Sequence, residues 1–293
     1  MATIKPDVKM LATSVVQRLL NAVTGITNVA VGANALANTA TSNNIAIGDN
    51  TLPLNGAGSE NIAIGANACK GGASIISNSA SRLVAVGVNA LRDITTGVES
   101  TAVGHSSALS LTTGLSNSSL GFESLAGNLT GSYNVAIGAQ ALKNPQAGDF
   151  NTGVGVQALE NSSGGANAAL GAGALRNNTS GANNTGIGLT ALFNNGGGNG
   201  NTAVGHASGT NINGGSGNVL LGTSSNVNGA GRNYCVCIGT GATSPAVDGT
   251  LAIGGTGGNV MTGLTIGSNG TGATTYLRVW LNGVEHRITA VAA

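Results

Sequence analysis

Charge and aromatic rings are both scarce in this sequence. Asp, Glu, Lys and Arg make up 7% of the 293 residues, and Phe, Trp and Tyr make up 2%. Because large side chains are rare, a wide spherical core cannot be filled at the density of a protein interior. The formal net charge of +1 comes without a basic or acidic block. Since nucleic acids and anionic membranes bind clustered Lys and Arg, we expect neither as a partner.

A long apolar run is also missing. A secretory signal peptide needs a basic start, an apolar stretch and a small-residue cleavage site. Near the N-terminus, Asp7, Lys9, Gln17 and Arg18 interrupt the apolar positions. No window approaches the roughly 20 apolar residues of a membrane helix. We therefore expect a chain that is made and folded in a cytoplasm, without a membrane partner.

Cysteine is rare: the sequence has three, Cys69, Cys235 and Cys237. An odd count gives no disulfide framework. Cys235 and Cys237 lie two apart in a predicted strand, so they share a face and are poorly placed to bridge each other. We interpret all three as small buried hydrophobic residues; a redox or metal role is the alternative.

Glycine, by contrast, is abundant, with 50 residues, and much of it is periodic. A glycine that follows Val, Ile or Leu returns most often after 17 residues, and we number this glycine as position 0 of a repeat. A fixed period of this length indicates one small structural unit stacked on itself. The glycines at position 0 are Gly32, Gly48, Gly65, Gly87, Gly104, Gly121, Gly138, Gly155, Gly171, Gly188, Gly205, Gly222, Gly239, Gly254 and Gly267.

The three residues before each repeat glycine predict a short strand. Position −1 is aliphatic in every unit, and position −2 is small in every unit except at Leu220. Small and branched side chains therefore alternate, which places the two classes on opposite faces of a strand. We expect both faces to be buried, the second of them by another chain.

Two further positions repeat. Asn stands at position −4 in ten units, where its side chain suits a turn and can stack into a ladder along the coils. Leu stands at position +4 in eight units and starts a second apolar segment such as ANALAN. We predict two short strands and two turns per coil, and a glycine at the bend where a Cβ would obstruct the chain.

The predicted fold class is therefore all-β: a parallel β-solenoid of about 15 coils at residues 26–270. At about 4.8 Å per coil, its length is about 70 Å. A helix-pair repeat of twice this period is the structural alternative. Glycine costs up to about 1 kcal/mol inside a helix, and every unit contains several glycines and β-branched residues, so we favour the solenoid.

Both ends depart from the repeat. At residues 1–25, Pro6 and Asp7 suit the start of a helix, Gly25 suits its end, and apolar residues recur at three- and four-residue steps between them. We predict a helical attachment segment here. Residues 271–293 predict a β-hairpin cap that turns at Asn282-Gly283. Trp280 is interpreted as a capping residue at a junction between chains, or alternatively as a ligand platform.

No residue set predicts catalysis, a cofactor or a metal site. The triplets Gly153-x-Gly155-x-x-Ala158 and Gly186-x-Gly188-x-x-Ala191 match a relaxed dinucleotide fingerprint, but they recur with the repeat and open no long helix.

The histidines and carboxylates are equally scattered. His105 and His206 follow repeat glycines in distant coils, and His286 lies in the predicted hairpin. They cannot form one metal site within a chain, although a threefold axis could gather three copies of one histidine. No carboxylate pair suggests acid–base catalysis, so we expect a protein that is not an enzyme.

The units NVAVGANAL, NIAIGANAC and NVAIGAQALKN, which begin at residues 28, 61 and 134, resemble the head repeats of trimeric autotransporter adhesins of the YadA type. They are more similar still to the 17-residue repeats of predicted bacteriophage tail fibres. The resemblance covers about residues 28 to 254, and the 22-residue step from Gly65 to Gly87 departs from it. It implies a left-handed parallel β-roll in a homotrimer, with the aliphatic residues facing a shared axis.

The resulting functional hypothesis is a structural fibre of a bacteriophage virion, located in the virion and in contact with the host surface. Residues 1–25 would bind other virion proteins, and loops or the C-terminal tip would contact a host glycan or protein. The alternatives are a capsid decoration or head fibre, an adhesin of the trimeric autotransporter type, and a free ice- or glycan-binding protein.

Overall fold

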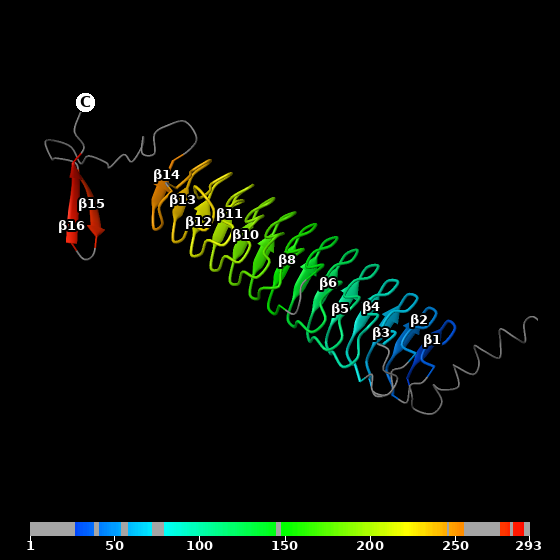
Figure 1. Ribbon diagram of the computed structural model, residues 1–293. Coiled ribbons are helices and arrows are strands. Elements are labelled where there is room, and N and C mark those ends of the chain that lie inside the picture. Colours follow the sequence, from blue (N-terminus) through cyan, green and yellow to red (C-terminus); the bar gives the residue numbers. More distant parts are fainter. Residues whose placement is uncertain are drawn as a thin grey trace, which may run out of the picture.

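The computed structural model describes residues 27–37, 41–53, 58–71, 79–144, 148–244 and 246–254, together with the backbone of two strands at 276–281 and 284–289. Over the repeat, the chain winds into coils that stack along one axis from β1 to β14 (Figure 1). The predicted helical segment 1–25 and the repeat at Gly267 lie outside the described residues.

Each repeat contributes one strand of three residues, and each strand pairs in parallel with the strands before and after it. The register is constant, so that position −2 of one coil faces position −2 of the next, as in Gly153↔Ala169. The described residues contain no helix, and the predicted all-β parallel solenoid is confirmed. The strands are β1 Val29–Val31, β2 Ile45–Ile47, β3 Ile62–Ile64, β4 Val84–Val86, β5 Thr101–Val103, β6 Ser118–Leu120, β7 Val135–Ile137, β8 Thr152–Val154, β9 Ala168–Leu170, β10 Thr185–Ile187, β11 Thr202–Val204, β12 Val219–Leu221, β13 Val236–Ile238 and β14 Leu251–Ile253.

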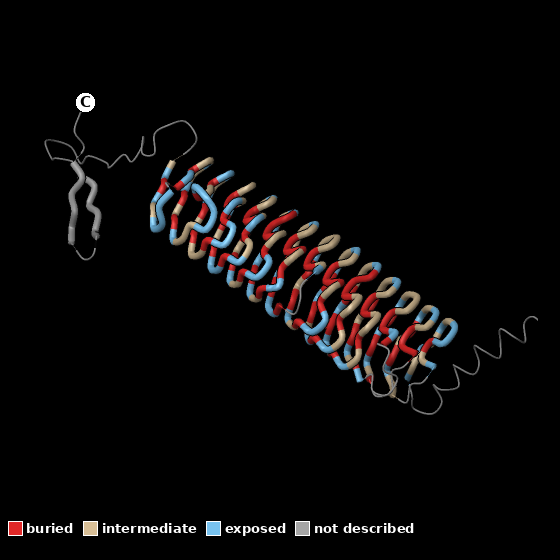
Figure 2. Tube along the Cα trace, viewed as in Figure 1, coloured by how far each residue is buried: buried red, intermediate tan, exposed pale blue. Residues whose placement is uncertain are grey.

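The core is a narrow column inside the coils. The middle residue of each strand from β2 to β14 is buried, and the leucines at position +4 from Leu52 onward are buried as well. Buried residues therefore recur at the same place in successive coils (Figure 2). With so little width inside, the strand contributes Ala or Gly to the interior, and the other side of the coil contributes one leucine.

One exchange of large and small residues shows how tightly this column is filled. Leu220 is the single large residue at position −2 of the strands, and it is fully buried. The preceding coil has Gly209 at position +4 in place of leucine. A Cβ on Gly209 would lie 2.8 Å from Leu220 Cδ1 and 2.8 Å from Leu192 Cδ2. The missing leucine at +4 is thus replaced by one that enters from the strand side.

The prediction of a second strand in each coil is wrong. The leucines at position +4 have φ between 47° and 55°, which is the left-handed region and not the extended region of a strand. This segment still bonds to the next coil: Leu142 N donates to Ala158 O at 2.9 Å, and Leu175 N donates to Ala191 O at 2.9 Å. Apolar alternation alone does not separate such a hydrogen-bonded turn from a strand.

The glycine at position 0 forms a corner that admits no side chain. From Gly32 to Gly254 its φ lies between 123° and 142°. A Cβ on Gly188 would lie 2.5 Å from Gly205 O and 2.6 Å from Gly205 C, and backbone of this kind cannot move aside. The predicted obstruction at the bend is confirmed, and the obstructing atoms belong to the next repeat glycine.

The predicted asparagine ladder at position −4 is also present. Asn134 N donates to Asn117 Oδ1 at 3.0 Å, and Asn134 Nδ2 donates to Gly148 O at 2.9 Å. The same pattern recurs at Asn184 and Asn201. Because these side chains are fully buried, the ladder satisfies backbone groups that would otherwise be buried without a partner.

The C-terminal hairpin is confirmed at the level of the backbone. Strands β15 (Tyr276–Leu281) and β16 (Val284–Thr289) pair antiparallel, from Tyr276↔Thr289 to Leu281↔Val284. This register is the one that a two-residue turn at Asn282-Gly283 requires.

Substitution of a corner glycine is expected to destabilise the solenoid strongly. Gly188→Ala adds a left-handed alanine and a collision with backbone, which together cost about 3–5 kcal/mol. Gly200→Ala is the matched control: its φ is +63°, and a Cβ there meets nothing within 4 Å, so only the conformational cost of about 1 kcal/mol remains. Thermal unfolding followed by circular dichroism measures both. Equal shifts in midpoint would contradict the corner packing.

Candidate functional site

A stripe of exposed aliphatic side chains runs along the outer face of the sheet from β1 to β14. It consists of the residues at position −1. They are between 36% exposed, at Leu221, and 57% exposed, at Val31, except at Val86, Val103 and Val154, which are partly buried. The sequence predicts burial on both strand faces; within one chain only the inner face is buried, so that prediction is not met by the single chain.

The stripe is continuous because the register never shifts. Val154, Leu170, Ile187 and Val204 are direct partners across four neighbouring strands. Exposed apolar residues flank it at position −3, as at Ile62 and Leu251, and at position +1, as at Phe122, Val156 and Leu189. Soluble monomers rarely expose apolar patches larger than a few hundred Å², and larger patches mark interaction sites.

The stripe also carries no charge. None of the strands from β1 to β14 contains Asp, Glu, Lys or Arg. Covering this face therefore removes apolar surface from water without stripping a charged group of its hydration. The chemistry of the stripe suits association with another apolar surface.

Several charged side chains on the turns pair with one another. Lys143 Nζ lies 2.8 Å from Glu123 Oε2, and Arg176 Nε lies 2.6 Å from Glu160 Oε2. The hydrogen bond from Lys143, followed by one from Gln140, lowers the pKa of Glu123 below its usual range. Each of these carboxylates thus has a structural partner, and the pairs do not converge on a common point.

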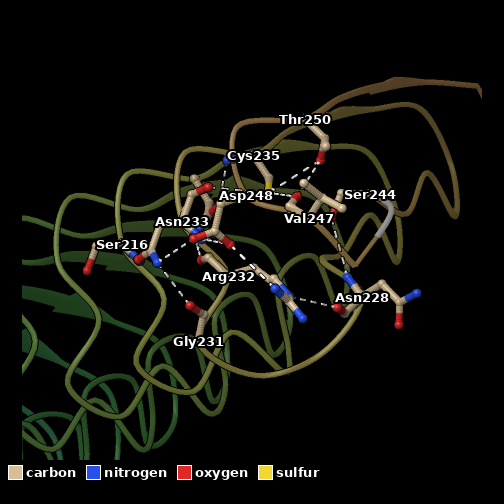
Figure 3. A network of polar contacts seen from close by, with 11 residues as sticks. Ser216, Asn228, Gly231, Arg232, Asn233, Cys235, Ser244, Val247, Asp248 and Thr250 are labelled. Carbon is tan, nitrogen blue, oxygen red and sulfur yellow. Dashed lines mark hydrogen bonds and ion pairs between the residues drawn. The ribbon is translucent and has the colours of Figure 1, made fainter.

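A denser polar network closes the described end of the solenoid (Figure 3). Asn233 donates through its backbone N and its Nδ2 to the carboxylate of Asp248, at 3.2 Å and 3.0 Å. Arg232 Nη1 lies 3.7 Å from the same carboxylate. These contacts lower the pKa of Asp248, with the Asn233 hydrogen bond as the main cause. The network joins the turns of the last described coils.

The sequence motifs that resemble cofactor and metal sites have structural roles. Gly153 is the small interior residue of β8, where a Cβ would lie 3.4 Å from Leu142 Cγ. Gly155 is a corner glycine, and a turn follows it instead of a helix. The His105 ring stacks on Phe122 with ring centroids 5.6 Å apart. Within the described ranges, no group of three or more His, Cys, Asp and Glu side chains is placed to hold a metal ion.

The three cysteines are free and buried, as predicted from the sequence. Cys69 occupies position +4, where leucine stands in most coils, and Cys235 and Cys237 lie on the inner side of the chain at β13. Burial raises the pKa of the Cys69 thiol from 9.0 to about 12, so this sulfur stays protonated and inert in the folded chain.

Comparisons with models of known protein families, with curated proteins and with solved structures found no match. Among the described residues, no helix combines the length and the apolar character needed to cross a lipid bilayer. The function is therefore inferred from the residues and the geometry of the chain itself.

The buried thiol gives a test of the core at alkaline pH. Its folded pKa is raised above the unfolded value, so its contribution to stability is complete below pH 9 and declines as pH rises from 9 toward 12. At pH 10, ionisation of the unfolded thiol lowers the free energy of unfolding by about 1.4 kcal/mol. Cys69→Leu removes this term. Denaturant unfolding at pH 7 and pH 10 should show the extra loss in the native sequence alone; parallel losses would contradict a buried Cys69.

Proposed function

We propose that the chain is the subunit of a homotrimeric fibre in which the aliphatic stripes of three solenoids face one axis. The observation that carries this proposal is the stripe itself: it is apolar, uncharged and continuous along all fourteen strands. Copies of the same chain, aligned side by side, offer one another a surface of matching length and chemistry. The number of three and the left-handed winding come from the resemblance to YadA-type heads.

We further propose that this fibre is a structural component of a bacteriophage virion, not an enzyme. The similarity of units such as NVAIGAQALKN to repeats of predicted phage tail fibres supports this setting. In such a fibre, residues 1–25 bind other virion proteins and the projecting rod contacts the host surface. Three identical chains present every surface feature three times, which lets weak contacts add through avidity.

The assembly is tested by a charge placed in the stripe. Ile137→Asp or Ile187→Asp puts an ionised carboxylate on the face that the trimer buries, and burial of an unpaired charge is strongly unfavourable. Light scattering after size-exclusion chromatography should give three times 28.2 kDa for the native chain and a single chain for either variant.

Leu129→Asp is the matched control for this test. Leu129 is 53% exposed but lies in a turn away from the strands, so its replacement should leave the mass unchanged. Trimeric Ile137→Asp and Ile187→Asp proteins, or a monomeric native chain, would remove the stripe as the interface.

The hairpin is expected to set the alignment of the three chains. The stripe is nearly uniform along the rod, so it alone does not oppose a slip by one coil. A variant truncated before residue 275 should therefore form fewer trimers and more higher aggregates on the same column. An unchanged elution profile would remove this role from the hairpin.

The virion setting is tested on particles. Antibodies raised against the purified rod should label phage particles that carry this gene, and electron microscopy shows where. Label at the tail supports a tail fibre, and label on the capsid supports a head fibre. Label on the bacterial envelope in the absence of phage would favour an adhesin of the trimeric autotransporter type and overturn the virion proposal.

A further inference from the structure

An open groove of about 880 Å³ crosses the turns that follow β9 to β13. Side-chain amides dominate its lining, from Asn177, Asn194, Asn211, Asn213, Asn226 and Asn228. Every lining residue lies at positions +2 to +8 of its repeat, and none lies in a strand. The groove is thus separate from the aliphatic stripe and remains open when the sheet face is covered.

The groove overlaps the end of a ladder of asparagines, at Asn177 and Asn194, and extends beyond it. Position +6 is Asn in six consecutive units, at residues 144, 161, 177, 194, 211 and 228. In the first four units each amide serves the next. Asn144 Nδ2 donates to Asn161 Oδ1 at 3.0 Å, Asn161 Nδ2 to Asn177 Oδ1 at 3.1 Å, and Asn177 Nδ2 to Asn194 Oδ1 at 2.8 Å.

Beyond Asn194 the column continues in sequence but not in hydrogen bonds. Over residues 148–244, the side chains of Asn211 and Asn228 form no hydrogen bond with the protein, and Asn194 Nδ2 has no acceptor in the next coil. Asn228 is held by its backbone instead: its N donates to Ser244 Oγ at 3.4 Å, and its O accepts from Arg232 Nε at 3.3 Å. In Figure 3 its amide extends away from the network.

The local cause is a change of residue at position +4. In the coil after β11 this position is Gly209, and in the next coil it is Asn226, where the other coils from β7 to β10 have leucine. The side-chain amide of Asn226 is already hydrogen-bonded within the protein: Val227 N donates to its Oδ1 at 2.9 Å, and its Nδ2 donates to Thr210 Oγ1 at 3.3 Å. The turns of these two coils therefore differ from the others at position +4, and at position +6 the side-chain amides of Asn211 and Asn228 are left free.

The residues that line the groove indicate which class of ligand it can bind. No Asp, Glu, Lys, Arg or His lines the groove, and Arg232, which bonds Asn228 O at its border, is paired with Asp248. The lining is therefore uncharged and suits a neutral ligand. Each free amide presents two donors and an acceptor, which matches hydroxyl groups that both donate and accept. Gly229 and Ala230, which are exposed, give apolar surface beside the amides. An uncharged ligand with many hydroxyl groups and apolar ring faces fits this combination.

We propose that this groove binds a neutral oligosaccharide through the free amides of Asn211 and Asn228 and the free Nδ2 of Asn194, whose Oδ1 already accepts from Asn177. The proposal rests on the fibre function only in placing that sugar on the host surface; binding itself is a property of the isolated protein. Three copies of the groove on one trimer would turn modest affinity for one sugar chain into firm attachment to a surface.

The experiment screens the purified full-length protein on an array of oligosaccharides. The neutral probes are chains of glucose, galactose, mannose and N-acetylhexosamines; sialylated and sulfated chains are the charged comparators. The strongest neutral probe is then titrated by calorimetry against two double variants. Asn211→Ala with Asn228→Ala removes the free amides, and Asn144→Ala with Asn161→Ala removes amides of the same column that are already hydrogen-bonded.

We expect binding of a neutral chain that falls at least tenfold in the Asn211/Asn228 variant and changes less than twofold in the Asn144/Asn161 variant. Ala230→Trp fills the groove from an exposed position and leaves every asparagine in place. This variant should abolish binding, and it covers the case in which the double variant misfolds. The proposal is overturned if no neutral probe binds, if charged probes bind more tightly, or if binding survives in Ala230→Trp. Because light scattering and particle labelling are separate readouts, failure here leaves the fibre proposal standing.

Discussion

The contact between successive corner glycines is the constraint on which the rest of the structure depends. At each corner the α-carbon of one glycine faces the carbonyl of the next coil so closely that a Cβ would lie 2.2–2.8 Å from it. The same glycine donates its N–H to position −1 of the preceding coil, as from Gly188 to Leu170 O at 2.7 Å. The spacing between coils, the register of the strands and the absence of a side chain at position 0 are therefore fixed together. The period of the sequence repeat follows from them.

Coils pressed this closely leave an interior too narrow for two large side chains. A strand whose preceding coil has leucine at +4 contributes Ala or Gly inward, and where Gly209 replaces that leucine the strand contributes Leu220. The larger aliphatic residues of each strand then have to point outward. An exposed apolar stripe is thus built into this winding, and it is the feature on which the proposed trimer rests.

The sequence predicted most of the features that depend on one repeat position. Alternation placed the strands, the aliphatic residue marked the outward side, Asn134 and its equivalents indicated the ladder, and Asn282-Gly283 predicted the register of the hairpin. It failed at position +4, because an apolar run such as ANALAN has the same pattern whether Leu36 is extended or, as found, at φ 50°. It also gave no sign of the groove, since six asparagines at +6 look equivalent until the distances between their amides are known.

The loss of a ladder hydrogen bond has different consequences for a buried asparagine and for an exposed one. The coil from Gly155 to Gly171 is one residue short. Just before this coil, Asn151 Nδ2 is buried without a hydrogen-bond partner; no ligand can reach it, so it only weakens the ladder. Asn211 and Asn228 have also lost their ladder partners, but they are exposed, so water or a ligand can satisfy them. In a repeat whose amides otherwise satisfy one another, recognition becomes possible where the ladder stops at the surface.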